Sequence, residues 1–130
     1  MSELLAEIVR HFQAGIGSGV STPPTLPAHL DNLDLVEAEW VAVAGRDLSV
    51  HRYADGVGHE VAVYRGLEAF EPPEGAELAG SGRWMLRTGA ATLFYSDEPL
   101  PSLVVGRDPG PVLHAVTHFE LAEDPGYTSL

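Results

Sequence analysis

The six histidines are the residues of this 130-residue sequence best suited to chemistry. His114 and His118 stand four residues apart, a spacing that on a helix is about 6 Å along the axis and allows both to bind one metal ion. On a strand the same spacing spans about 13 Å, which one ion cannot bridge. A third ligand is also needed, and Glu120, His51 and His59 are the candidates. Surface or edge histidines are the simpler interpretation, so we expect no metal and no cofactor.

His51 and His59 are also candidates for ligand binding or general-base catalysis in a pocket between a sheet and its helices. A neutral imidazole near pH 7 can accept a proton. His59-Glu60 begins like a zinc-protease motif, but Val63 occupies the position of the second histidine. The sequence contains no Gly-x-Ser-x-Gly elbow, no Walker loop and no dinucleotide fingerprint. No catalytic residue is therefore assigned, and a Ser/His/Asp triad, whose members converge only in space, stays open.

Paired carboxylates are the second chemical pattern. Glu37 and Glu39 fall on one face of a predicted strand, where two carboxyls can split their pKa values and act as acid and base. An exposed, charged strand face explains the pair more simply. Further along, glutamates recur at every third position, but Pro72 and Pro73 exclude a regular helix there. We expect a solvated loop that carries Glu68, Glu71, Glu74 and Glu77.

The segments that must position these side chains are predicted to be short strands. Gly45-Arg46-Asp47 is expected to turn the chain, and Asp55-Gly56-Val57-Gly58 is a strong hairpin signal. Short loops between alternating strands indicate an antiparallel meander. Trp40 and Trp84 are expected in the core or covering the sheet rather than holding a cofactor. The predicted strands are 36–43, 48–54 and 59–65, then a hairpin of 84–87 and 90–96, then a central strand at 102–106.

Ser2 to Ala14 is predicted to form an amphipathic helix, because its apolar residues recur at helical spacing. A single apolar stripe on a short helix needs a partner surface. We expect that surface to be the protein's own sheet. The alternative is that Ile8 and Phe12 contact another chain.

Residues 110–122 fit either a helix or an alternating strand, and Asp108-Pro109 slightly favours the helix as a capped start. The segment 16–34 is a Pro/Gly-rich connector, and 123–130 is a tail. The glycines that begin the connector do not predict a phosphate site, because a phosphate-binding loop should follow a strand and open a helix.

The composition is strongly acidic. Nineteen acidic residues against seven basic ones give a formal charge of −12, which disfavours nucleic acid and anionic membranes as partners. All basic residues are Arg, and the scarcity of Ile and Asn is typical of a GC-rich bacterial genome. The lack of Cys excludes disulfides, thiolate metal sites and Cys nucleophiles. With no basic leader and no apolar run of membrane-spanning length, we expect a soluble cytoplasmic protein.

Several strand segments carry a family resemblance. They are His51–Gly56, Val61–Arg65, Trp84 with Thr92–Phe94, and Pro101–Gly106. Together they resemble the small C-terminal sensor-like domains of some membrane-bound anti-sigma factors and related uncharacterised proteins of GC-rich bacteria. Such regulators also look to have a zinc-binding domain with His and Cys ligands and a membrane span. This sequence has neither, so the resemblance implies only the sensor-like part and carries over no functional residues.

We therefore predict one α+β domain over residues 1–130. Its centre is an antiparallel sheet of about five to seven strands, covered by the N-terminal helix and, if 110–122 is helical, by a C-terminal one. Open sheet edges are commonly covered or paired, which makes a homodimer a natural expectation. The predicted function is a non-enzymatic protein-binding or regulatory module. The alternative is a small-ligand binder or hydrolase-type enzyme that uses histidines in its pocket.

Overall fold

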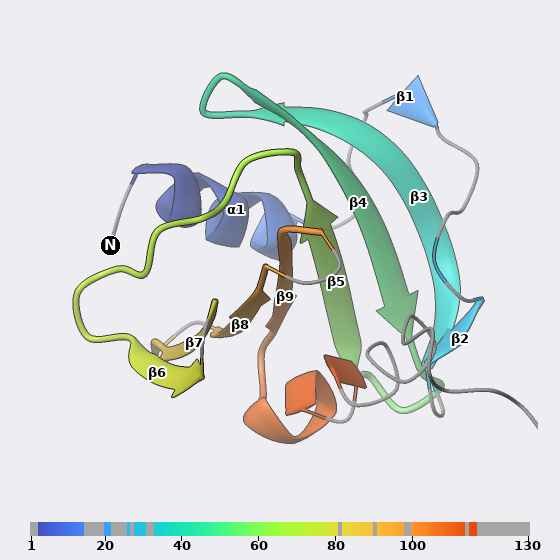
Figure 1. The fold of residues 1–130 in the computed structure, drawn as a ribbon. Helices are drawn as coiled ribbons and strands as arrows, with labels where there is room; N and C mark the ends of the chain where they lie inside the picture. Colours follow the sequence, from blue (N-terminus) through green and yellow to red (C-terminus); the bar gives the residue numbers. More distant parts are fainter. Residues whose placement is uncertain are drawn as a thin grey trace, which may run out of the picture.

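One antiparallel sheet forms the body of the molecule, and helix α1 (Glu3–Ala14) lies on its concave side (Figure 1). The computed structural model describes residues 3–14, 20–21, 26, 28–30, 33–80, 82–89, 91–97, 100–113 and 115–116. Within these residues the sheet has nine strands, of which β1 (Val20–Ser21) and β2 (His29–Leu30) have two residues each. The longer strands are β3 (Leu33–Val43), β4 (Arg46–Ala54), β5 (Glu60–Arg65), β6 (Glu77–Gly80), β7 (Arg83–Arg87), β8 (Thr92–Ser96) and β9 (Ser102–Gly106). The predicted α+β class is confirmed.

Strand β9 joins two meanders into one sheet. The order is β1-β3-β4-β5-β9-β8-β7-β6, and β2 also pairs with β3. β9, the last strand among the described residues, thus lies between β5 and β8, antiparallel to both. This confirms that 102–106 is a central strand, whose nearly all-apolar sequence suits burial on both faces.

The hairpin between β3 and β4 turns at Ala44 and Gly45 rather than at the predicted Gly45-Arg46-Asp47. Val43 pairs with Arg46, so the loop has two residues, and their φ angles are 50° and 79°. A type I′ turn requires a positive φ at both positions. The prediction failed because alanine rarely adopts this conformation and gives no turn signal.

The interpretation of Glu37 and Glu39 as an exposed charged face of β3 is wrong. A bulge between Leu35 and Glu37 shifts the register, and beyond it Glu39 pairs with the core residue Val50. Glu39 is buried and Glu37 is partly buried, whereas Trp40, on the other face, is half exposed. Each carboxylate has a partner inside the fold. Glu37 Oε2 lies 3.3 Å from Nε of the buried Arg52 of β4, and Glu39 Oε1 lies 3.8 Å from Nε2 of His11 of α1.

Helix α1 packs its apolar stripe into the concave face of the sheet. Ile8 and Phe12 are buried in this core together with Trp84, so the alternative that they contact another chain is wrong. The physical reason is that the sheet curves around the helix and supplies the partner surface itself (Figure 1). Among the described residues, no helix is long and apolar enough to cross a membrane. The buried residues of α1 are Leu5, Ile8, Val9 and Phe12.

A short helical segment covers part of the opposite face. Residues 109–113 and 115–116 are helical, which confirms the helix prediction for them. Val112, Ala115 and Val116 of this segment belong to the same buried cluster as Tyr53 of β4 and Val61 of β5. The contact is close, because a Cβ added to Gly106 would lie 2.5 Å from Val112 Cγ2. His114, His118 and Glu120 lie outside the described residues, and so do the glycines that open the connector.

The long connection from β5 to β6 carries the predicted solvated glutamates. Glu68, Glu71 and Glu74 are exposed, and Glu77 begins the exposed strand β6. Phe70 anchors this loop to the core by hydrogen bonds to the side chains of Tyr95 and Trp84.

Candidate functional site

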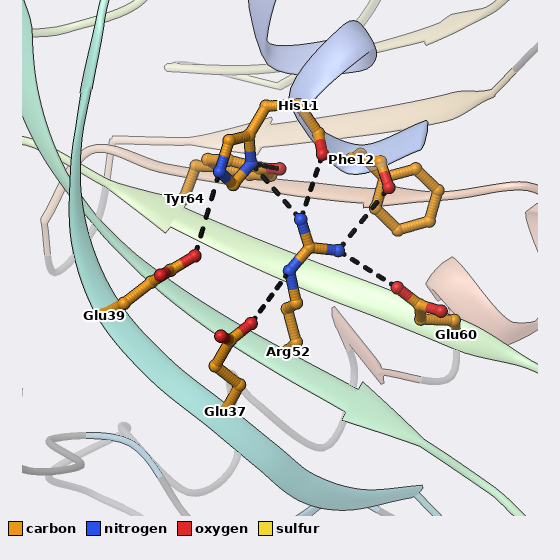
Figure 2. A network of polar contacts seen from close by, with 7 residues as sticks. All are labelled: His11, Phe12, Glu37, Glu39, Arg52, Glu60 and Tyr64. Atoms are coloured by element: carbon orange, nitrogen blue, oxygen red, sulfur yellow. Dashed lines mark hydrogen bonds and ion pairs between the residues drawn. The ribbon is translucent and has the colours of Figure 1, made fainter. Parts of the chain in front are cut away.

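The buried residue Arg52 stands at the centre of a polar network between α1 and the sheet (Figure 2). Its Nε lies 3.3 Å from Glu37 Oε2, and its Nη1 donates to Glu60 Oε1 at 3.0 Å. Strand register imposes both contacts. Arg52 pairs directly with Glu37 of β3 and with Ala62 of β5, which makes Glu60 its diagonal neighbour on the same face.

The guanidinium of Arg52 also binds the last turn of α1. Nη2 donates to the His11 carbonyl at 3.0 Å, and Nη1 lies 3.5 Å from the Phe12 carbonyl. The helix ends at Ala14, so the carbonyls of its last four residues have no N–H partner within the helix. A cation at this position satisfies them and interacts favourably with the negative end of the helix dipole. Arg52 therefore fixes the end of α1 on the sheet.

His11 extends the network toward Tyr64 and Glu39. Its Nδ1 lies 2.8 Å from Tyr64 Oη and 3.3 Å from Arg52 Nη2, and its Nε2 lies 3.8 Å from Glu39 Oε1. Because a guanidinium can only donate, Nδ1 acts as acceptor and the ring proton belongs on Nε2, facing Glu39. Burial lowers the pKa of His11, the charge of Arg52 lowers it further, and Glu39 opposes the shift. The imidazole is therefore neutral at pH 7.

The network as a whole is rich in negative charge. Burial raises the pKa of Glu37, the Glu39 carboxylate raises it further, and the charge of Arg52 opposes both.

His11 borders a shallow surface hollow of about 330 Å³, but Arg52 faces the helix end rather than this hollow. The geometry accordingly suits attachment of α1 better than proton transfer to a substrate. The other residues that line the hollow are Glu7, Arg10, Ala42 and Val43.

A cavity of about 350 Å³ lies on the opposite face of the same strands. Successive side chains of a strand point to opposite faces, so His51 lines this cavity while its neighbour Arg52 faces α1. The register brings Trp40 of β3, Ser49 of β4 and Arg65 of β5 side by side across the sheet. The lining residues are Trp40, Asp47, Ser49, His51, Arg65, Gly66, Leu67 and Leu100.

The floor of this cavity is polar and firmly held. His51 is fully buried and Arg65 is nine-tenths buried. Burial lowers the pKa of His51 to about 4, and the charge of Arg65 contributes to the shift. Arg65 Nε donates to Ser102 Oγ at 2.9 Å, and Ser102 Oγ donates in turn to the Leu100 carbonyl at 2.8 Å. The floor thus presents a cation and a neutral imidazole, and hydrogen bonds connect it to the rim.

The rim of the cavity is apolar and exposed. Trp40 is 49% exposed, Leu67 93% and Leu100 45%. Trp84 is a core residue, as predicted, whereas Trp40 lies at the cavity mouth and leaves half of its surface to solvent.

The fold does not bring together His51 and His59, the two candidate histidines among the described residues. His51 pairs with Val63 in the middle of the β4–β5 ladder, whereas His59 lies in the turn, past the last pair, Ala54 with Glu60. Asp55 Oδ1 accepts the backbone N–H groups of Val57 and His59 at 2.9 Å each, and Asp55 Oδ2 lies 2.7 Å from His59 Nδ1. His59 therefore stabilises a turn. Within the part of the chain that the structure describes, no three His, Asp or Glu side chains are placed to hold one metal ion.

Sequence reasoning missed both buried arginines. On β4, Arg52 falls on the same face as the buried apolar residues Leu48 and Val50. On β5, Arg65 falls on the same face as the buried residue Val63. A charged residue in such a position must find partners inside the fold, which is a signal that alternation alone could have supplied.

Comparison with known proteins adds no relative. No family model matches the chain, and no curated protein and no solved structure matches it either. The resemblance to anti-sigma sensor-like domains stays a prediction.

Proposed function

We propose that this protein is a non-enzymatic binding module whose cavity receives an apolar side chain of a partner protein. The observation that carries the proposal is the exposed apolar rim of Trp40, Leu67 and Leu100 around one preformed cavity. Single exposed apolar residues are normal on protein surfaces. A group of them around a concavity is typical of an interaction site.

The residue types fit an interface. Tryptophan and arginine are enriched among the residues that dominate binding energy, particularly where a pocket excludes water. Here Trp40 belongs to the rim and Arg65 to the floor of the same cavity. A volume of about 350 Å³ is at the small end for ligand pockets, which suits one or two side chains.

A small-ligand binder or a hydrolase-type enzyme that uses His51 is the second candidate. Its support is that His51 lines the cavity. A general base works best with a pKa near the working pH, and the pKa of His51 is about 4. This favours binding over base catalysis.

Selection from a library of random peptides with free C-termini, using the full chain as target, tests the proposal. We expect selected peptides to bind at least tenfold more weakly to Trp40→Ala and Leu67→Ser, since apolar hot spots carry at least this much energy. Val57→Ser is the matched control, because Val57 is 78% exposed in a loop away from the cavity. Peptides that bind all variants equally, or a selection without specific binders, would contradict the proposal.

We also infer that the protein acts in the bacterial cytoplasm and that two copies pair through the edge strand β6. All residues of β6 are exposed, and β6 ends the strand order of the described sheet. Such an edge is a natural site of strand pairing. Native mass spectrometry is expected to give a dimer mass, and a monomer at micromolar concentration would exclude this pairing.

A further inference from the structure

We propose that the cavity recognises the C-terminal residue of a basic partner segment, with the free carboxylate at Arg65 and the apolar side chain against Trp40, Leu67 and Leu100. This inference rests on the proposed function and adds the chemical identity of the group that is bound.

The carboxylate preference comes from the floor. Arg65 is nine-tenths buried, and its Nε–H is hydrogen-bonded to Ser102 Oγ at 2.9 Å, which fixes the plane of the guanidinium. A guanidinium held in this way presents a planar set of donors that matches the two oxygens of a carboxylate.

The charge at the buried floor is opposite to that of the molecule, because Arg65 is a cation and the chain as a whole carries −12. Among the described residues that line the cavity, Asp47 is the one acidic residue, and it is exposed, whereas Arg65 is buried. A bound carboxylate therefore meets a cation in a partly desolvated setting, where charged hydrogen bonds are strongest. One guanidinium compensates one negative charge, which suits a carboxylate better than a phosphate dianion.

The rest of the partner segment is inferred from the net charge. The chain carries a formal charge of −12, which repels polyacidic ligands and attracts basic ones. A segment with basic residues upstream and a single carboxylate at its end is complementary to both the surface and the floor. The apolar rim completes the match, since it contacts the side chain of the final residue.

A matched pair of peptides tests this inference. The peptides selected on the wild-type chain are synthesised twice, with a free C-terminal acid and with a C-terminal amide, and their binding is measured by fluorescence anisotropy. We expect the acid to bind at least tenfold more tightly, because one or two charged hydrogen bonds are lost in the amide. We also expect Arg65→Lys to reduce this preference and Val57→Ser to retain it. The acid–amide comparison on the wild-type chain needs no variant and stands even if a substitution of Arg65 prevents folding.

The outcomes separate the two proposals. Equal binding of acid and amide would overturn the carboxylate inference and leave the binding module standing. If no peptide shows rim-dependent binding, the proposed function itself fails. The N-acetylated form of the final amino acid is a third probe. If it binds as tightly as the whole peptide, the site takes a small apolar acid, which overturns the choice of a protein segment.

Discussion

Replacing Arg52 with methionine tests whether the buried network holds α1 on the sheet. Methionine has a similar length but no donors, so Arg52→Met leaves Glu37 and the last carbonyls of α1 without their cation. Breaking a buried ion pair from one side costs about 3–5 kcal/mol. The contact with Glu60 contributes less, because the Glu60 side chain is 40% exposed and solvent screens it. We therefore expect a loss of about 3 kcal/mol in the free energy of unfolding, at the lower end of this range.

Urea unfolding at pH 7, followed by far-UV circular dichroism, measures this loss. For a domain of this size it corresponds to a melting temperature roughly 10–15 °C lower. Arg10→Met is the matched control, because the Arg10 side chain lies on the same helix, is 69% exposed and stands 3.9 Å from Glu7. Exposed pairs of this kind contribute less than about 1 kcal/mol.

A second substitution locates the origin of the cost. In the double variant Arg52→Met/Glu37→Gln the buried carboxylate becomes neutral, and we expect about 1 kcal/mol or more to be recovered. An Arg52→Met protein within about 1 kcal/mol of wild type would refute the view that Arg52 fixes α1. A double variant no more stable than Arg52→Met would refute the view that Glu37 is the charge left without compensation.

Further predictions concern pH and packing. The pKa of His51 is about 4 in the fold, below its ordinary 6.5, so its contribution to stability is complete above pH 6.5 and is lost as the pH falls toward 4. The loss amounts to roughly 3 kcal/mol at about 1.4 kcal/mol per pKa unit, and urea unfolding across this range should show a weaker acid dependence in His51→Gln. The pKa of Glu37 is raised above its ordinary 4.5 in the fold. The contribution of Glu37 to stability is therefore complete below pH 4.5 and is lost as the pH rises through the pKa that Glu37 has in the folded protein. Relative to wild type, Glu37→Gln should therefore gain stability between pH 4.5 and 7, and an unchanged difference would exclude Glu37 as the titrating group. Gly106→Ala should destabilise the fold by about 1–3 kcal/mol, because the added Cβ meets Val112 at 2.5 Å. Gly89→Ala, with open space around it, should not, and equal melting temperatures for the two variants would contradict this packing.

The strands could be predicted where alternation and turn residues agree. The segment that became β5 alternates and follows the Asp55–Gly58 turn, and the apolar run of β9 indicated a central strand. The strand order could not be predicted. The pairing of β9 with β5 joins segments that are separated by a long loop and the three strands β6, β7 and β8, and no local pattern encodes it. The turn at Ala44 also escaped prediction, because its conformation is imposed by the two strands rather than by its own side chain.

The candidate sites were harder to predict than the fold. His51 was a candidate from the sequence, and it lines the cavity, but its neighbours there come from three strands and two loops. Glu37 and Glu39 were assigned to an exposed face because a carboxylate is rarely buried without a partner. Arg52, the partner of Glu37, lies on the next strand, and only the register places it opposite that glutamate, whereas Glu39 faces His11 of α1.

The two sites lie back to back because neighbouring residues on two strands supply both. On β4, His51 faces the cavity and Arg52 faces α1, and on β5, Arg65 and Tyr64 divide in the same way. The side that carries α1 holds the larger core and the buried network, so it supplies most of the stability. Because most of the stability comes from that side, the other face can leave Trp40 and the cavity uncovered. The hydrogen-bonded ladder of β3, β4 and β5 fixes the cavity floor independently of α1. An Arg52→Met protein that remains folded should therefore bind selected peptides nearly as tightly as wild type, although it unfolds more easily. A parallel loss of binding and stability would instead mean that the cavity depends on the attachment of α1.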